Sequence, residues 1–229
     1  MKKGFTLSEV LITLVVIGVV AAITIPTVLG DWQKERTLTA LKKTYSTFSN
    51  AMELAILKEG PFDTWNIKTH VTGAWSFAEK YILPYVSTSK NCKIDTNEGC
   101  EFKFKYIDLS RRNSGELNAG YFRFMTLDGV LVAIKIEEYT KDGVEKLRPS
   151  LIVDINGSAP PNMYGRDIFM FEYYDDGASG KFVAYNEPNL TREQTYTSGD
   201  SACNRQSKGE YCAALIMKDN WHLSKNYPW

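Results

Sequence analysis

Histidine is scarce in this chain, and cysteine is not abundant. The 229 residues include two histidines, His70 and His222, and four cysteines. Neither histidine lies in a Gly-x-Ser-x-Gly or His-Glu-x-x-His frame, the local arrangements found around many hydrolytic serines and catalytic zinc ions. No glycine-rich loop follows a predicted strand and opens a helix, so nucleotide binding has no basis in the sequence. These absences argue against an enzyme of the common hydrolytic classes.

The chain also has no net charge. The 27 basic residues balance the 27 acidic ones, and no basic patch or aromatic-interleaved Lys/Arg run is present. Nucleic acid is therefore not implied as a partner. The sequence also lacks internal repeats and low-complexity linkers. Residues 60–229 are sufficient for one domain with a sizeable core.

The feature that is present is an unusual amino-terminal segment. Two basic residues, Lys2 and Lys3, precede an almost entirely apolar segment, residues 5–29. At about 1.5 Å of rise per residue, this segment is long enough to cross a bilayer as one helix. Its one charge is Glu9. Since a carboxylate deep in a membrane costs roughly 3 kcal/mol, an acidic residue there is a functional hypothesis by default.

A short basic leader that ends in Gly4, followed by Phe5 and then by Glu9, resembles the start of type IV pilins and pseudopilins. The resemblance implies that a prepilin peptidase cleaves the Gly4–Phe5 bond and methylates the amino group of Phe5. It also implies that Glu9 neutralises the terminal amine of a neighbouring subunit, because opposite charges buried together cost less than either alone. Gly18 and Pro26 lie where many members of the family have Gly and Pro.

Two other interpretations of this segment stay open. A secretory signal peptide also has a basic start and an apolar run, and Val20-Ala21-Ala22 has the small residues of its cleavage site. A simple membrane anchor is the second alternative, but it gives no reason for Glu9. In every case the basic start favours a cytoplasmic amino terminus. We expect a single-pass protein of the bacterial inner membrane, with a globular domain outside and a periplasmic or surface filament after assembly.

The helical pattern continues beyond the apolar segment. Apolar residues recur at three- and four-residue steps from Leu38 to Ala55, and Gly60-Pro61 ends the pattern. This predicts one long helix to about Lys58, with residues 1–4 as leader, 5–29 as membrane and assembly half, 30–59 as amphipathic half, and 60–229 as exported domain. Pro26 should kink or loosen the helix. The pilin resemblance implies that the helix unfolds locally around Pro26 when the filament assembles. The alternative is a simple bend of the helix at the membrane surface.

The rest of the chain predicts an α+β fold. A short helix is expected over 74–85, and the hydrophobic period then changes to two residues. Asp128-Gly129 marks a tight hairpin. The pilin resemblance likewise implies an antiparallel sheet packed on the amphipathic part of the first helix. The predicted strands are 101–107, 121–125, 130–136, 151–155 and 168–173, with 181–184 as a further candidate.

The cysteines form two close pairs, Cys92 with Cys100 and Cys203 with Cys212. Four cysteines allow three connectivities, and short loops favour the local one. Disulfides are the expected state outside the cytoplasm. A zinc site is the alternative, but neither pair has Cys-x-x-Cys spacing. The pilin resemblance also implies that a disulfide fixes the carboxyl-terminal loop, where Cys203–Cys212 lies.

One loop has the chemistry of a hard-cation site. Asp154 and Asn156 are two residues apart, Gly157 follows them, and Asp167 comes later. These oxygen-bearing side chains are suited to calcium, which some pseudopilins hold in a loop beside the sheet. The spacing is not that of an EF-hand. The alternative is turn chemistry, in which the Asp and Asn side chains cap the backbone and Gly supplies a positive φ.

Taken together, the sequence predicts a filament-forming pseudopilin of a type II secretion system. A type IV pilus subunit is the main alternative, and a membrane-anchored enzyme or binding module is a minor one. The expected partners are homologous subunits, prepilin peptidase, the inner-membrane assembly platform and lipid. The aromatic carboxyl end either packs on the domain or forms a partner surface; its residues are Trp221, Tyr227 and Trp229.

Overall fold

A computed structural model of the chain describes residues 4, 6–92, 103–117, 120–141 and 143–229. The chain divides into two compact units, Met1–Thr39 and Ala40–Trp229. Helix α1, Leu7–Glu59, begins in the first unit and ends in the second. Its end agrees with the prediction, because Gly60 follows with a φ of 90° that suits a residue without a side chain. The helix is continuous through Pro26, so this proline does not end it.

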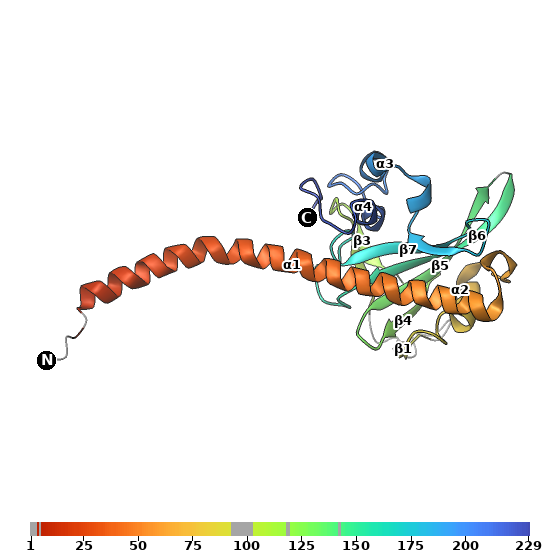
Figure 1. Cartoon of the computed structure of the whole chain (residues 1–229), viewed down its shortest axis with the longest axis horizontal. Coiled ribbons are helices and arrows are strands. Elements are labelled where there is room, and N and C mark those ends of the chain that lie inside the picture. Colours follow the sequence, from red (N-terminus) through yellow and green to blue (C-terminus); the bar gives the residue numbers. More distant parts are fainter. Residues whose placement is uncertain (1–3, 5, 93–102, 118–119, 142) are drawn as a thin grey trace. The chain divides into compact units, whose positions relative to one another are not determined.

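The second unit contains a six-stranded antiparallel sheet in the order β1-β4-β5-β6-β7-β8 (Figure 1). Strands β5 and β6 pair over their whole length, from Leu131↔Asp154 to Lys141↔Val144. A second sheet pairs β2 with β3. The remaining elements are η1 (Phe62–Thr64), α2 (His70–Tyr81), β1 (Thr88–Asn91), β2 (Lys105–Ile107), β3 (Ser114–Glu116), β4 (Phe122–Thr126), β5 (Leu131–Lys141), β6 (Val144–Asp154), β7 (Ile168–Tyr174), β8 (Lys181–Ala184), η2 (Glu187–Asn189), α3 (Arg192–Thr197) and α4 (Cys212–Lys218).

One face of the large sheet packs against the end of α1. The ring of Phe48 lies 6.4 Å from that of Phe124 and 5.8 Å from that of Phe182, and Tyr45 lies 6.0 Å from Phe171. Leu41 and Phe48 are buried on the same side of the helix. The three- and four-residue spacing of these apolar positions therefore forms the stripe that an amphipathic helix presents to a core.

The opposite face of the sheet is also covered. Side chains that alternate with the helix-facing ones pack under the small β2–β3 sheet and the chain around Tyr164. Since both faces are buried, β7 is apolar at almost every position rather than alternating. The buried members of this second core include Phe104, Leu131, Ala133, Ile152, Tyr164, Ile168 and Met170.

Several element boundaries differ from the sequence predictions. The short helix begins at His70 instead of Ala74, with Gly73 inside it, because a Cβ at Gly73 would lie 1.8 Å from the carbonyl oxygen of Lys68. It ends at Tyr81, since Pro84 disfavours the helical conformation in the residue before it. Of the strand predicted over 101–107, only Lys105–Ile107 is a strand, and 101–102 lie outside the described residues. Strand β6 begins at Val144, well before the predicted position 151.

The predicted hairpin is confirmed. Gly129 has a φ of 88°, and the N–H of Thr126 donates to the carbonyl of Val130 at 3.0 Å. The aromatic tail packs rather than forming a separate patch: Trp221 lies 5.2 Å from Tyr45, and the Tyr227 hydroxyl donates to the carbonyl of Gly165 at 2.5 Å. This long-range bond fixes the end of the domain.

Candidate functional site

The start of α1 contains a capping box. The backbone N–H of Glu9 donates to Thr6 Oγ1 at 3.3 Å, and the backbone N–H of Thr6 donates to Glu9 Oε2 at 2.8 Å. The Thr6 hydroxyl donates to the same carboxylate oxygen at 2.8 Å. Because the first turn of a helix leaves N–H groups without partners, this reciprocal pair stabilises the helix end. Gly4 is exposed and lies before the helix, and Phe5 lies outside the described residues.

The sequence analysis did not find this local role for Glu9, although Thr-x-x-Glu before an apolar run is its signal. Both hydrogen bonds that Glu9 accepts from Thr6 use Oε2. Oε1 accepts no hydrogen bond from any described residue. One carboxylate can therefore cap its own helix and still present an oxygen to the amine of another chain.

The apolar part of α1 has no covering within its own unit. Its large side chains are exposed, from 43% at Val10 to 79% at Leu7. Within the described part of the chain, α1 is the single helix long and apolar enough to cross a membrane. An apolar surface of this extent is expected to meet lipid or other helices rather than water.

Gly18 and Pro26 lie on this helix. A Cβ built at Gly18 would meet no heavy atom within 4 Å, so no contact with the described residues requires a glycine there. Small residues on transmembrane helices let another helix approach closely, and Gly18 is suited to this role. Pro26 lies inside the continuous helix, so its assembly role stays a prediction.

One of the two predicted disulfides is confirmed. Cys203 and Cys212 are bonded, with their Cα atoms 4.7 Å apart, and both are buried. Cys92 is described and buried, but Cys100 lies outside the described residues, so the Cys92–Cys100 bond stays a prediction.

The structure brings the three residues of the suggested cation loop together. Asp154 ends β6, and Asn156 Nδ2 donates to Asp167 Oδ2 at 3.3 Å. The other end of the Asn156 amide faces only oxygen atoms: Asp154 Oδ1 at 2.8 Å, Ala159 O at 3.1 Å and Gly157 O at 3.2 Å. Asn162, which the sequence analysis did not single out as a ligand, joins the group, because one end of its amide faces Asp154 Oδ2 at 3.0 Å and Ala159 O at 3.1 Å.

These contacts have two chemical explanations. If the amide nitrogens point inward, they donate to Asp154 and the loop is a hydrogen-bonded turn. If the amide oxygens point inward, carboxylate, amide and main-chain oxygens converge, and such a set fits the six to eight oxygen ligands of calcium. Within the described part of the chain, no cluster of three or more His, Cys, Asp or Glu side chains could hold a metal. A cation here would therefore depend on amide and main-chain oxygens.

The electrostatics of the loop favour a proton or a cation beside Asp154. Asp154 is 1% exposed and Asp167 is 3% exposed. Burial, and then the nearby charge of Asp167, raise the pKa of Asp154 from 3.8 to about 8. Burial also raises the pKa of Asp167, although the N–H groups of Met163 and Asn162 donate to it at 2.6 and 2.8 Å. Two buried carboxylates without a cation repel each other.

Comparison with known proteins first gives the class. Residues 1–25 match the model of the prokaryotic N-terminal methylation motif, the prepilin-type signal of type IV pilins and pseudopilins. The chain therefore has the amino-terminal signal found in type IV pilins and pseudopilins, and this signal implies processing by prepilin peptidase and assembly with other pilin subunits. Residues 27–229 match a second model, and the chain belongs to that family, described as a family of unknown function (DUF6613). No curated protein and no solved structure matches the chain.

Proposed function

We propose that this chain is a filament subunit, cleaved at Gly4–Phe5, methylated at Phe5 and assembled through the apolar half of α1. The observation that carries the proposal is the helix start, where Glu9 caps its own helix with Oε2 and keeps Oε1 available. The mature amino group would be only four residues from Glu9 in its own chain. A neighbouring subunit displaced along the filament would bring its amine to the free oxygen.

The amino-terminal sequence and mass of the protein from its native membrane test the processing step. A chain that begins with N-methylated Phe5 supports the proposal. A chain that begins at Ile23, after the Val20-Ala21-Ala22 segment, would mean a secreted soluble domain and would overturn it.

Three variants separate the two roles of Glu9. Thr6→Val removes the hydroxyl from the cap and keeps the carboxylate, Glu9→Gln keeps a capping acceptor and removes the charge, and Glu9→Ala removes both. We expect all three to insert in the membrane. Glu9→Gln and Glu9→Ala should strongly reduce cross-linked oligomers, whereas Thr6→Val should retain most of them. Wild-type oligomers in Glu9→Gln would show that the charge has no role in assembly.

Within this class, we propose a pseudopilin of a type II secretion system, with a type IV pilus subunit as the alternative. The Asp154 loop favours the first, because some pseudopilins hold calcium in a loop beside the sheet and the oxygen-bearing side chains of this loop would suit the same ion. Deletion of the gene in the native host distinguishes the two. Loss of secreted enzymes from the medium with unchanged surface filaments supports the pseudopilin; loss of filaments with normal secretion supports the pilus subunit.

We further propose that the loop formed by Asp154, Asn156, Gly157, Asn162 and Asp167 binds calcium. Their oxygens would hold the cation, and calcium would neutralise the two buried carboxylates. Titration of calcium into the chelator-treated protein, followed by thermal unfolding, tests this. We expect a rise in the unfolding temperature that Asp154→Asn abolishes and Asp63→Asn, at an exposed position, retains. An equal response of wild type and Asp154→Asn would exclude this site.

A further inference from the structure

Three arginines line one pocket in the second unit. The pocket has a volume of about 320 Å³, and Arg111, Arg166 and Arg205 share its wall with Ser110 and Pro228. The described residues that line it include no carboxylate. The arginines are far apart in sequence and come from three different loops, so no local sequence motif predicts the cluster.

The three loops are tied to one another by main-chain hydrogen bonds. The N–H groups of Leu109 and Ser110 donate to the carbonyls of Lys208 and Ser207, both at 2.9 Å. This joins the loop of Arg111 to that of Arg205, which the Cys203–Cys212 disulfide closes. The N–H of Tyr164 donates to the carbonyl of Ile107 at 3.0 Å, which joins the loop of Arg166 to the same frame. The cluster is therefore held by the fold.

The guanidinium groups of the cluster lack side-chain ion pairs. Among the described residues, no Asp or Glu side chain forms an ion pair with Arg111, Arg166 or Arg205. Arg166 Nε is buried without a hydrogen-bond partner, and the Arg166 guanidinium lies 5.7 Å from the centre of the Trp229 ring. Arg205 Nη2 donates to the Trp229 carbonyl at 2.9 Å.

We propose that this pocket binds a tetrahedral oxyanion, namely a phosphate or sulfate group. Guanidinium groups pair with such anions through two parallel hydrogen bonds, and a bound anion would remove the repulsion among the three arginines. Ser110 supplies a hydroxyl donor. The residues that line this pocket include no residue of α1 and none of the five proposed calcium-binding residues.

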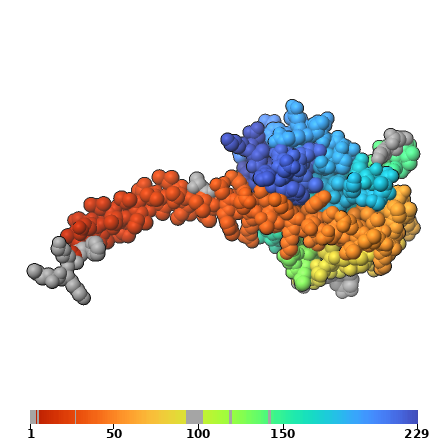
Figure 2. Space-filling model, in the orientation of Figure 1, coloured from red at the N-terminus to blue at the C-terminus, as the bar shows by residue number. Residues whose placement is uncertain are grey.

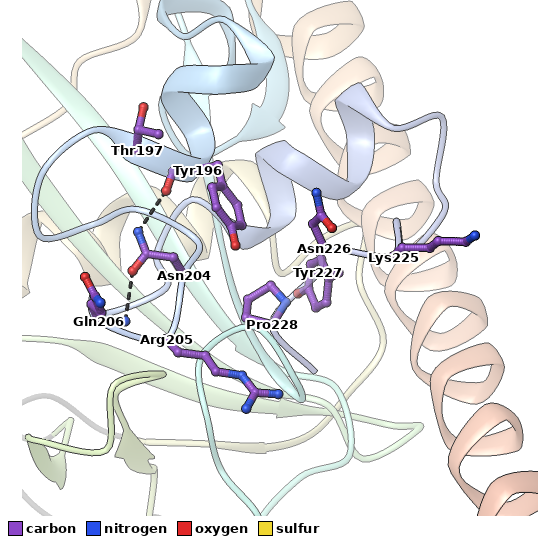
Figure 3. A pocket seen from close by; sticks show the side chains of 9 residues that line it. All are labelled: Tyr196, Thr197, Asn204, Arg205, Gln206, Lys225, Asn226, Tyr227 and Pro228. Carbon is purple, nitrogen blue, oxygen red and sulfur yellow. Dashed lines mark hydrogen bonds between the residues drawn. The ribbon is translucent and has the colours of Figure 1, made fainter.

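A second pocket, of about 590 Å³, shares Arg205 and Pro228 with the first. Figure 3 shows Tyr196 and Asn226 facing the space between them, with Arg205 below. Asn204 is engaged internally, since its Nδ2 donates to the Tyr196 carbonyl at 2.8 Å. The exposed ring of Tyr196, and the Asn226 amide, which has no hydrogen-bond partner among the described residues, suit a sugar attached to the anion. The oxyanion can thus come from two sources, the free ion or a sugar monoester.

Calorimetric titration of the full chain in detergent tests the proposal, with sodium phosphate and sodium sulfate compared with chloride at equal ionic strength. We expect heat of binding from phosphate and sulfate only. Arg111→Gln and Arg205→Gln, both at exposed positions, should each weaken binding by about tenfold, because each removes a charge-assisted hydrogen bond. The matched control is Arg112→Gln, which makes the same charge change one residue outside the pocket and should leave binding within about twofold.

The two sources are separated by glucose 6-phosphate and glucose. Equal affinities for phosphate and glucose 6-phosphate identify the free ion. Tighter binding of glucose 6-phosphate, lost in Asn226→Ala, identifies the monoester. The proposal is overturned if phosphate binds no better than chloride, or if Arg112→Gln weakens binding as much as Arg111→Gln.

Discussion

The same helix has two different surroundings in its two units. In the first unit, Leu14 is 60% exposed; in the second, Leu41 is fully buried. Both residues are leucines on α1, but Leu41 belongs to an amphipathic stripe and Leu14 to a segment that is apolar all round. The difference teaches that helical periodicity identifies the part of a helix that folds with its own chain. Uniform apolarity identifies the part that needs another partner.

The largest effect is expected from a change before the helix. Replacing Gly4 by Trp should leave nearly all of the protein as an uncut precursor, because the proposed peptidase needs a small residue at the cleaved bond. The domain should fold normally. Immunoblotting and the mass of the membrane-bound chain measure this. Gly30→Trp, at another open glycine of the first unit, is the control and should be cleaved as the wild type is.

The comparison of the two leucines can be tested directly. Leu41→Ala removes a fully buried side chain and should lower the free energy of unfolding of the domain by about 2–5 kcal/mol. Leu14→Ala, the same substitution at an exposed position, should leave it unchanged. Chemical denaturation in detergent, followed by tryptophan fluorescence, measures both. Similar losses in the two variants would contradict the division between the units.

A change of pH should act on the domain and leave the first unit unaffected. Because burial raises the pKa of Asp154 from 3.8 to about 8, the folded state holds this proton more tightly than the unfolded state. Without calcium, the free energy of unfolding should therefore fall as pH rises from about 4 to 8, by up to about 1.4 kcal/mol per pH unit. Asp154→Asn should remove most of this slope. A slope that is the same in Asp154→Asn would assign the pH dependence to other groups.

The smallest effect should come from Gly18. Gly18→Ala meets open space and should stabilise the isolated helix by about 0.5–1 kcal/mol, while reducing cross-linking between subunits. Gly73→Ala is the contrasting variant, because it places a methyl group 1.8 Å from the Lys68 carbonyl oxygen and should strongly destabilise the domain. Circular dichroism and cross-linking distinguish the two. Unchanged cross-linking in Gly18→Ala would leave that glycine without a role at an interface.

The sequence predicted the long helix, four strands of the large sheet and the α+β class, because each depends on a hydrophobic period that is visible locally. Its further candidate strand, 181–184, is β8 of the same sheet. It missed β1 and β3, since Thr88–Asn91 and Ser114–Glu116 are short and polar and have no such period. It placed Asp154, Asn156 and Asp167 in one loop but did not include Asn162. The contact of Asn162 with Asp154 depends on how the chain between them turns, which spacing does not reveal.

The arginine cluster could not be predicted at all, for a different reason. Arg111, Arg166 and Arg205 lie in three loops and meet because main-chain hydrogen bonds join the chain after β2 to the segment around Tyr164 and to the Cys203–Cys212 loop. The predicted start of α2 was wrong for a different reason, namely that a local sequence signal disagreed with the packing of the fold. Gly73 indicates a break when it is considered alone, but its close approach to Lys68 requires it inside α2.

The bond between Tyr227 and Gly165 joins positions 62 residues apart. Contacts of such separation form late, since a long stretch of chain must be ordered first. During export of a chain that crosses the membrane in order, Arg166 would arrive long before its neighbour Trp229. Until the last residues had emerged, the loop around Gly165 would lack its partner. If the chain is exported and assembled as proposed, the domain would complete its fold only after Tyr227 had crossed the membrane, and a subunit would present its complete surface to a filament only after that moment.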